Sequence, residues 1–240
     1  MSENYWTQRK DEILTFREYA LSLDLSKDLE TGVWLSESGH QLMEIAFQLL
    51  FLGLSDDALA LAQRAIHYYQ AALVRESKRP ESDPRMAATY HRLYYARWWV
   101  AGQEPLGLLR QAASAFVAGL GESPKLEGAD IYIRAARLWL ELGEVSLAEK
   151  WLGLAKRAIV QTTSNNVFPD LSLMHQLLDS QRIRGTSDEA CTALQAAIES
   201  ASAWGQPTAS TLWDALQLAN IHRRLCGLQL DLPGLLMRIR

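Results

Sequence analysis

The chain lacks the features that identify disulfide-rich secreted proteins, membrane proteins and exported proteins. It contains two cysteines in 240 residues, too few for the disulfide framework of a small secreted protein. Its longest apolar run, residues 49–54, is far shorter than the roughly 20 residues needed to span a bilayer. The first twelve residues are polar and charged, where a signal peptide would be apolar. We therefore expect a cytoplasmic protein without a membrane segment.

A strong excess of charge of either sign is also missing. The formal net charge is −4, with 22% charged and 48% hydrophobic residues. This balance is typical of a chain that folds around a core and excludes an intrinsically disordered protein. A slightly acidic chain has no overall attraction for phosphate backbones, so nucleic acid is disfavoured as a partner.

Sequence signatures of catalysis and metal binding do not occur. The chain has no His-Glu-x-x-His, Cys-x-x-Cys, Gly-x-Ser-x-Gly or phosphate-binding loop. His40 and Glu44, and His222 and Cys226, are spaced four residues apart, but a structural metal site normally needs four ligands. We predict that the protein is not an enzyme and that it binds no metal and no cofactor.

Apolar residues recur at helical spacing along most of the chain. Ile45, Leu49 and Leu52 form one such stripe, whereas alternating strand patterns are almost absent. Segments rich in proline, glycine, serine and asparagine separate the helical stretches at residues 77–84, 121–124, 162–166 and 205–208. The sequence therefore predicts an all-α protein.

A glycine recurs about every forty residues, at the end of one predicted helix and before the next. These glycines, separated by 49, 41, 42 and 42 residues, are Gly53, Gly102, Gly143, Gly185 and Gly227. Three of them are followed five residues later by an alanine: Ala58, Ala148 and Ala190. Glycine can close a helix in the left-handed conformation, and alanine lets the next helix pack closely. The frame predicts repeated α-α hairpins.

This spacing, a glycine followed five residues later by an alanine, resembles the second half of a tetratricopeptide repeat. The resemblance covers residues 37–227 and holds at superfamily level only. The period is longer than the roughly 34 residues of that family. The small residue expected midway along each first helix is present at Ala46 and Ala136 but not in the other hairpins. The resemblance implies a right-handed α-solenoid-like single domain, whose first helices line a concave face that binds a peptide or a protein. The alternative is an ordinary multi-helix bundle.

We accordingly expect one domain over residues 1–240. It has an N-terminal helix and connector at 1–36 (the helix at 1–24), repeats at 37–227 and a C-terminal cap at 228–240. The four predicted hairpins are 37–76, 87–120, 129–162 and 170–203, followed by a fifth first helix at 208–226.

The resemblance also implies which residues face the concave side, counted back from each glycine. The predicted partner-binding residues are Phe47, Arg92, Trp99, Asp130, Arg137, Glu141, His175, Asp179 and Arg182. The alternative is that they are ordinary surface residues that form ion pairs along a helix, such as Arg137 with Glu141.

Residues 90–99 are unusually rich in aromatic side chains, with two tryptophans and three tyrosines. Three interpretations are open: packing in the core, a protein-binding hot spot, or base stacking beside Arg85, Arg92 and Arg97. We favour the core, because an internal helix of a repeat array needs apolar side chains on two faces.

The sequence thus favours a non-catalytic protein-binding module. In general build it is similar to bacterial immunity proteins that neutralise a toxin, and to adaptors or chaperones that escort a secreted protein. A nucleic-acid-binding or regulatory protein and a self-assembling structural protein are the alternatives. Strongly salt-dependent binding would indicate the first of these, and light scattering would detect the second.

Overall fold

The computed structural model describes residues 3–31, 34–76, 84–120, 129–161, 209–225 and 227–239. These residues form α-helices and short turns, and none of them lies in a strand. The all-α prediction is therefore confirmed for this part of the chain. Packing contacts divide the chain into two compact units. Unit 1 comprises residues 1–119 and 231–238, and unit 2 comprises residues 120–230.

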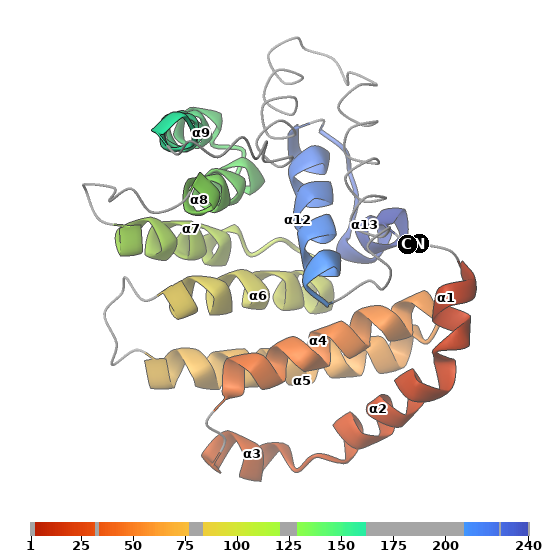
Figure 1. Cartoon of the computed structure of the whole chain (residues 1–240). Helices are drawn as coiled ribbons and strands as arrows, with labels where there is room; N and C mark the ends of the chain where they lie inside the picture. The colour runs from red at the N-terminus through yellow and green to blue at the C-terminus, as the bar shows by residue number, and fades with distance from the viewer. Residues whose placement is uncertain are drawn as a thin grey trace. The chain divides into compact units, whose positions relative to one another are not determined.

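Most of the described helices belong to unit 1 (Figure 1). They are α1 (Glu3–Gln8), α2 (Lys10–Ser22), α3 (Leu25–Thr31), α4 (Leu35–Phe51), α5 (Ser55–Glu76), α6 (Pro84–Ala101), α7 (Leu106–Leu120) and α13 (Leu232–Ile239). Unit 2 contains α8 (Ala129–Glu141), α9 (Val145–Gln161) and α12 (Ala209–Leu225).

Helix positions agree closely with the sequence pattern. The helix pairs α4–α5, α6–α7 and α8–α9 begin within three residues of the predicted hairpins at 37–76, 87–120 and 129–162. In two of these pairs, α4–α5 and α8–α9, the helices pack against each other. Helix α12 corresponds to the predicted fifth first helix. The predicted hairpin at 170–203 lies outside the described residues.

Four of the recurring glycines adopt the left-handed conformation, as predicted. The φ angles of Gly53, Gly102, Gly143 and Gly227 are 79°, 66°, 76° and 67°. At the first of these turns the amide of Leu54 donates to the carbonyl of Leu49 at 2.9 Å, which closes α4 in a Schellman arrangement. Gly185 lies outside the described residues.

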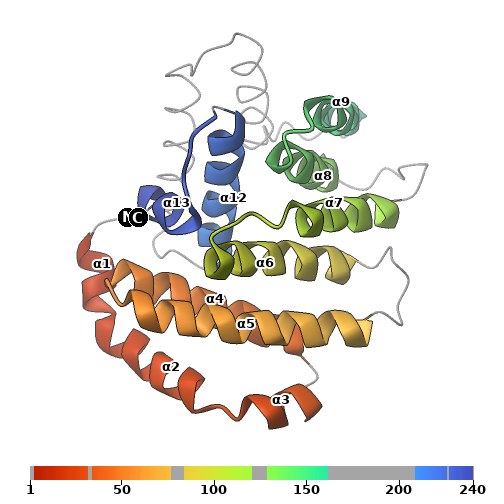
Figure 2. The same ribbon diagram turned by 180° about the vertical axis from the view of Figure 1, so that it is seen from behind.

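The core of unit 1 is aromatic and is centred on α4, α5 and α6. Helix α5 packs on both of the others, and the two opposite views in Figures 1 and 2 show the three helices with their axes in roughly the same direction. The rings of Phe47 and Trp99 stack with centroids 5.6 Å apart. Tyr94, Tyr95 and Trp98 are also buried. The aromatic segment 90–99 therefore supplies core packing, the interpretation favoured from the sequence.

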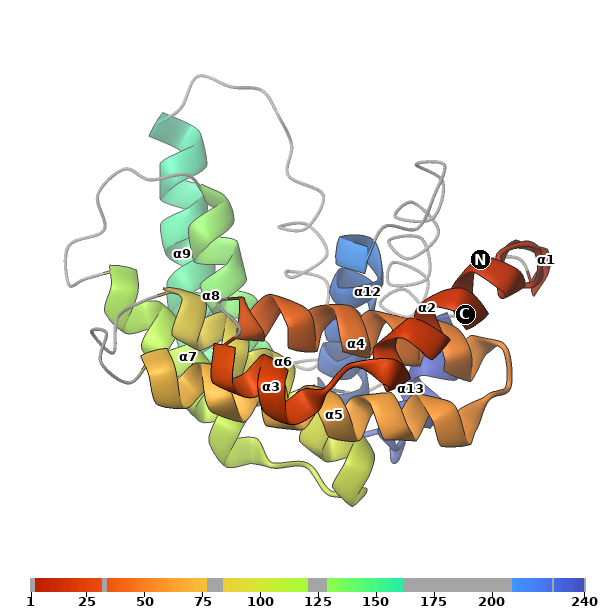
Figure 3. The ribbon, with the colours of Figure 1, turned by 90° about the horizontal axis from the view of Figure 1, so that it is seen from below.

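The N-terminal arm, defined here as α1–α3 (residues 3–31), differs from the predicted single helix and connector. The chain forms three helices here, and the last of them begins because Asp24 caps a new helix after α2. Its Oδ1 accepts from the amides of Ser26 and Lys27 at 3.1 and 3.3 Å, which is an N-cap. The view from below in Figure 3 shows α2 and α3 on the near side of α4 and α5, and α2 contacts both of these helices.

None of the described helices is long and apolar enough to cross a membrane.

Candidate functional site

A cavity of about 630 Å³ lies in unit 1 between the N-terminal arm and α4. We call it the arm groove. Its outer wall is one face of α2 with the C-cap residue Leu23, where the lining residues recur at helical spacing: Phe16, Tyr19, Ala20 and Leu23. Its inner wall is a face of α4, with the lining residues Ser38, Gln41, Ile45 and Gln48. Two helix faces thus border one groove.

Three large aromatic side chains line this groove and remain exposed to solvent. The exposed fractions are 46% for Phe16, 64% for Tyr19 and 73% for Trp34. Full burial of a large apolar side chain contributes about 1.5–3 kcal/mol. Covering these rings with another apolar surface would therefore be favourable. Exposed aromatic side chains gathered at one concave place are typical of interaction sites.

Tyr68 of α5 connects the floor of the groove to the arm. Its hydroxyl donates to Oδ2 of Asp28 at 2.8 Å. Burial raises the pKa of Tyr68 to about 12, and the hydrogen bond to Asp28 and the charge of that carboxylate add to the effect. The protonated hydroxyl is therefore held firmly as a donor to α3.

Two arginines of α5 hold the carboxyl ends of the arm helices. Arg64 donates to the carbonyl of Leu21 at 2.9 Å and also to that of Leu23, at the end of α2. Arg75 donates to the carbonyls of Leu29 and Glu30, both at 2.6 Å, at the end of α3. The last carbonyls of a helix lack partners within it and carry partial negative charge, so a guanidinium stabilises them. These contacts fix the outer wall relative to α5.

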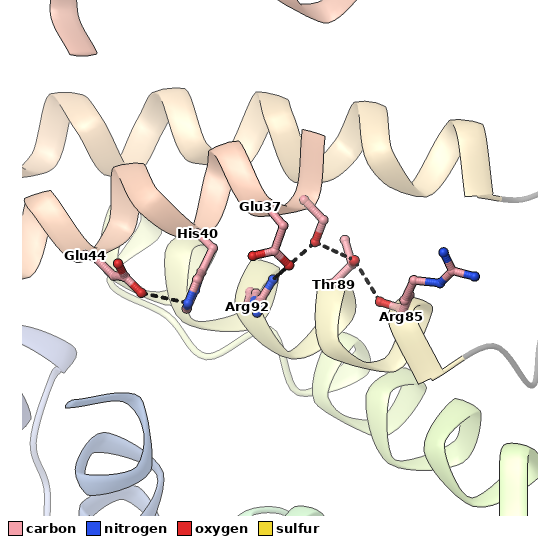
Figure 4. A network of polar contacts seen from close by, with 7 residues as sticks. Glu37, His40, Glu44, Arg85, Thr89 and Arg92 are labelled. Atoms are coloured by element: carbon pink, nitrogen blue, oxygen red, sulfur yellow. Dashed lines mark hydrogen bonds and ion pairs between the residues drawn. The ribbon is translucent and has the colours of Figure 1, made fainter. Parts of the chain in front are cut away.

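A polar network joins the inner wall to α6 (Figure 4). Nη1 of Arg92 lies 3.0 Å from Oε1 of Glu37. The hydroxyl groups of Ser36 and Thr89 lie 2.9 Å apart, and Thr89 donates to the carbonyl of Arg85 at 2.8 Å. Helix α4 is therefore fastened to α6 by hydrogen bonds as well as by the Phe47–Trp99 stack.

A second polar pair lies further along α4, near a buried tyrosine. Nε2 of His40 is 2.7 Å from Oε1 of Glu44, one turn apart on the helix (Figure 4).

The ring of Tyr69 packs so closely on Gly39 that a Cβ there would lie 2.8 Å from the ring. Burial raises the pKa of Tyr69, and its hydroxyl has no hydrogen-bond partner among the described residues. This part of the α4–α5 interface therefore depends on close packing.

Unit 2 contains a buried polar cluster between α8 and α12. Glu141 accepts from Nε2 of Gln217 at 2.8 Å and from Nδ2 of Asn220 at 3.0 Å. Asn220 in turn accepts from Nε and Nη2 of Arg223 at 3.1 and 2.9 Å. All four side chains are buried. Buried polar groups satisfied in this way fix how two helices pair.

The predicted partner-binding residues fall into three groups. Phe47 and Trp99 are in the core of unit 1, while Arg137 and Glu141 are buried in unit 2, where α12 packs against α8. These four side chains are packed inside the protein and do not line an open face. Arg92 is partly exposed and pairs with Glu37. The remaining positions are not described at side-chain level: Asp130 lies on α8, and His175, Asp179 and Arg182 lie outside the described residues.

The arm groove was not anticipated from the sequence. Phe16 falls within the predicted N-terminal helix at 1–24, and Trp34 falls within the predicted connector. Helical spacing shows that α2 has an apolar face, but it does not show whether another element covers that face. No local pattern distinguishes these exposed rings from aromatic rings that pack in a core.

No group of three or more histidine, cysteine, aspartate or glutamate side chains suited to a metal ion occurs in the part of the chain that the structure describes. Comparison of the chain with protein-family models, with curated proteins and with solved structures gave no match.

Proposed function

We propose that this chain is a non-catalytic protein-binding module of the cytoplasm and that a protein partner docks in the arm groove. The observation that carries the proposal is the presence of three exposed aromatic side chains, Phe16, Tyr19 and Trp34, around one cavity of about 630 Å³. Tyrosine and tryptophan dominate the binding energy of many protein interfaces. A rigid support suits such a role, since the arginines of α5 and the α4–α6 network hold both walls.

We also propose that the helices form a tetratricopeptide-like array of α-α hairpins, a right-handed α-solenoid. The left-handed glycines that end α4, α6, α8 and α12 support this assignment, as do the buried alanines Ala58 and Ala148, which each follow one of these glycines by five residues. The arm groove lies at the N-terminal end of this array. Within the class of binding modules, the small acidic build favours an immunity protein that neutralises a toxin, or an adaptor or chaperone for a secreted protein.

The alternative of a nucleic-acid-binding protein receives no support from α6. The aromatic rings of Tyr94, Tyr95 and Trp98 are buried, so they are not accessible for base stacking in this conformation. Arg92 is engaged with Glu37.

The proposal is tested with the double variant Tyr19→Ala/Trp34→Ala. Both side chains are largely exposed, so its stability should stay within about 0.5 kcal/mol of the wild type. Affinity capture from lysate of the source organism, read by mass spectrometry, should recover one protein at stoichiometric level with the wild type. Recovery with the double variant should fall about tenfold or more, the loss typical of two interface hot spots.

Val74→Ala is the matched control, because Val74 is an apolar residue of α5 that is 71% exposed and does not line the groove. It should capture the partner as well as the wild type does. Equal recovery with all three proteins, or recovery of nucleic acid only at low salt, would contradict the proposal.

A further inference from the structure

We infer that the occupant of the arm groove is a basic amphipathic helix of the partner protein. This inference rests on the proposed function and specifies the chemistry of the docking segment. It follows from the shape of the groove, from its exposed rings and from the charge of the segment that builds it.

The shape of the groove suits a helix. Its inner wall follows α4 from Ser38 to Gln48, and its outer wall follows α2 from Phe16 to the C-cap residue Leu23. Ten residues of helix rise about 15 Å, so the inner wall matches three turns of a docked helix. Both walls present side chains at three- and four-residue spacing. A third helix with apolar residues at i, i+3 or i+4, and i+7 complements such walls, as in known helix-in-groove complexes.

The exposed rings provide the apolar contact for such a helix. Phe16 and Tyr19 belong to the outer wall, and Trp34 precedes the first turn of α4. Ile45 contributes an aliphatic side chain to the inner wall between Gln41 and Gln48. The apolar face of a helix would cover the rings, while the glutamine amides meet its polar edge.

The charge of the groove segment indicates the charge of the partner. Residues 1–48 contain nine acidic and four basic side chains, a net charge of −5, whereas the whole chain carries −4. Two of the four basic side chains are already held in ion pairs: Arg9 lies 2.7 Å from Glu12, and Arg17 lies 3.0 Å from Asp57. Since the whole chain carries −4, residues 49–240 carry a net charge of +1, and the negative charge is concentrated on the arm and α4.

Acidic side chains lie both in the groove and on the arm beside it. Asp28 and Glu44 line the cavity, together with one basic side chain, Arg9, which is paired with Glu12. Three further carboxylates are exposed on the arm: Glu18, Asp24 and Glu30. A carboxylate has acceptor sites for several donors, so Asp28 keeps acceptor capacity beyond its bond to Tyr68. Lysine and arginine on the polar face of a docked helix complement this surface, and an acidic helix is repelled.

The test is selection of peptides against the full chain. A phage library of random peptides of about 16 residues, long enough for four helical turns, is panned on the wild type after counter-selection on Tyr19→Ala/Trp34→Ala. The enriched sequences should be net positive, with apolar residues at i, i+3 or i+4, and i+7. Acidic, proline-rich or unpatterned sequences, or no enrichment, would overturn the inference.

The best enriched peptide is then measured by fluorescence anisotropy. Its Kd should rise about tenfold or more for Tyr19→Ala/Trp34→Ala, and about threefold for Glu18→Gln/Glu30→Gln, the loss typical of exposed ion pairs. Val74→Ala and Asp56→Asn, which alter exposed positions outside the groove, should leave Kd unchanged. Raising the salt from about 0.05 M to about 0.3 M should weaken binding of the peptide, because salt screens exposed charges.

The outcomes separate this inference from the proposed function. If the groove variant loses the captured protein but the selected peptides are not basic and helical, the proposed function stands and this inference fails. If the groove variant loses neither protein nor peptide, both fail. Sedimentation that shows a dimer dissolved by Tyr19→Ala/Trp34→Ala would assign the groove to a second copy of this chain and also overturn the inference.

Discussion

Two neighbouring tyrosines of α5 differ in the hydrogen bonding of their hydroxyl groups. The hydroxyl of Tyr68 donates to Asp28, whereas that of Tyr69 has no partner among the described residues. Tyr68→Phe should lower the free energy of unfolding by about 1 kcal/mol, because it leaves Asp28 without its donor. Tyr69→Phe should be neutral or slightly stabilising, because it removes a buried polar group without a bond. Urea denaturation followed by tryptophan fluorescence measures both, and equal losses would contradict the assigned contacts.

The raised pKa of Tyr68 predicts how the stability of the protein depends on pH. The pKa of Tyr68 is raised from 10.0 to about 12, first by burial and then by the bond to Asp28 and its charge. The folded state keeps this proton over a range in which the unfolded chain releases it. Its contribution to stability is therefore complete below about pH 10 and is lost as the pH rises toward 12.

Urea midpoints measured at steps between about pH 9 and pH 12 should fall for the wild type. The fall should be shallower for Tyr68→Phe, which lacks the titrating group. The raised pKa of Tyr69 affects both proteins equally, so the difference between the two curves isolates Tyr68. Parallel curves would show that its pKa is not raised in the folded state.

At the scale of elements, the turn between α6 and α7 provides a matched pair of glycines. Gly102 has a φ of 66°, whereas Gly107 lies in the first turn of α7, and a Cβ at either position would meet nothing within 4 Å. Gly102→Ala should cost about 1–2 kcal/mol of unfolding free energy from backbone strain alone. Gly107→Ala should gain about 0.5–1 kcal/mol, since alanine favours a helix. Thermal denaturation would refute this account if both substitutions had the same sign.

The pairing of α8 with α12 depends on the buried carboxylate of Glu141. Glu141→Ala removes the acceptor of two amide donors, those of Gln217 and Asn220, and leaves them buried. We expect a loss of about 3 kcal/mol of unfolding free energy. Arg134→Ala changes an exposed residue of the same helix and should stay within about 0.5 kcal/mol of the wild type. A similar loss in both variants would argue against a structural role for the buried cluster.

At the scale of the whole molecule, the division into two compact units predicts how such a change spreads. Hydrogen exchange of Glu141→Ala, read by mass spectrometry, should increase in α8, α9 and α12 by a factor that corresponds to its loss of stability. The amides of α4, α5 and α6 should exchange as in the wild type. An equal increase in both sets of helices would show that the chain unfolds as one cooperative unit.

Much of the helical framework is predictable because it depends on local patterns. Breaker segments set where helices end, and the left-handed turn at Gly53 requires only a residue without a Cβ. The helix α3 is not predicted, although the N-cap of Asp24 is a local signal, because a helix of only seven residues has too few turns to show a clear apolar periodicity. The burial of four aromatic rings in residues 90–99 agrees with the favoured interpretation; the rings are those of Tyr94, Tyr95, Trp98 and Trp99.

Local sequence patterns predict that the chain is helical, where most described helices begin and end, and which glycines close them. These features depend on interactions within about one or two helical turns. Which helix faces are covered depends instead on contacts between helices. Glu141 is buried because α12 packs on α8, and Trp34 is exposed because the arm, fixed to α5 by Arg64 and Arg75, leaves a groove beside it. Those contacts join residues far apart in the chain, which periodicity along one helix does not reveal.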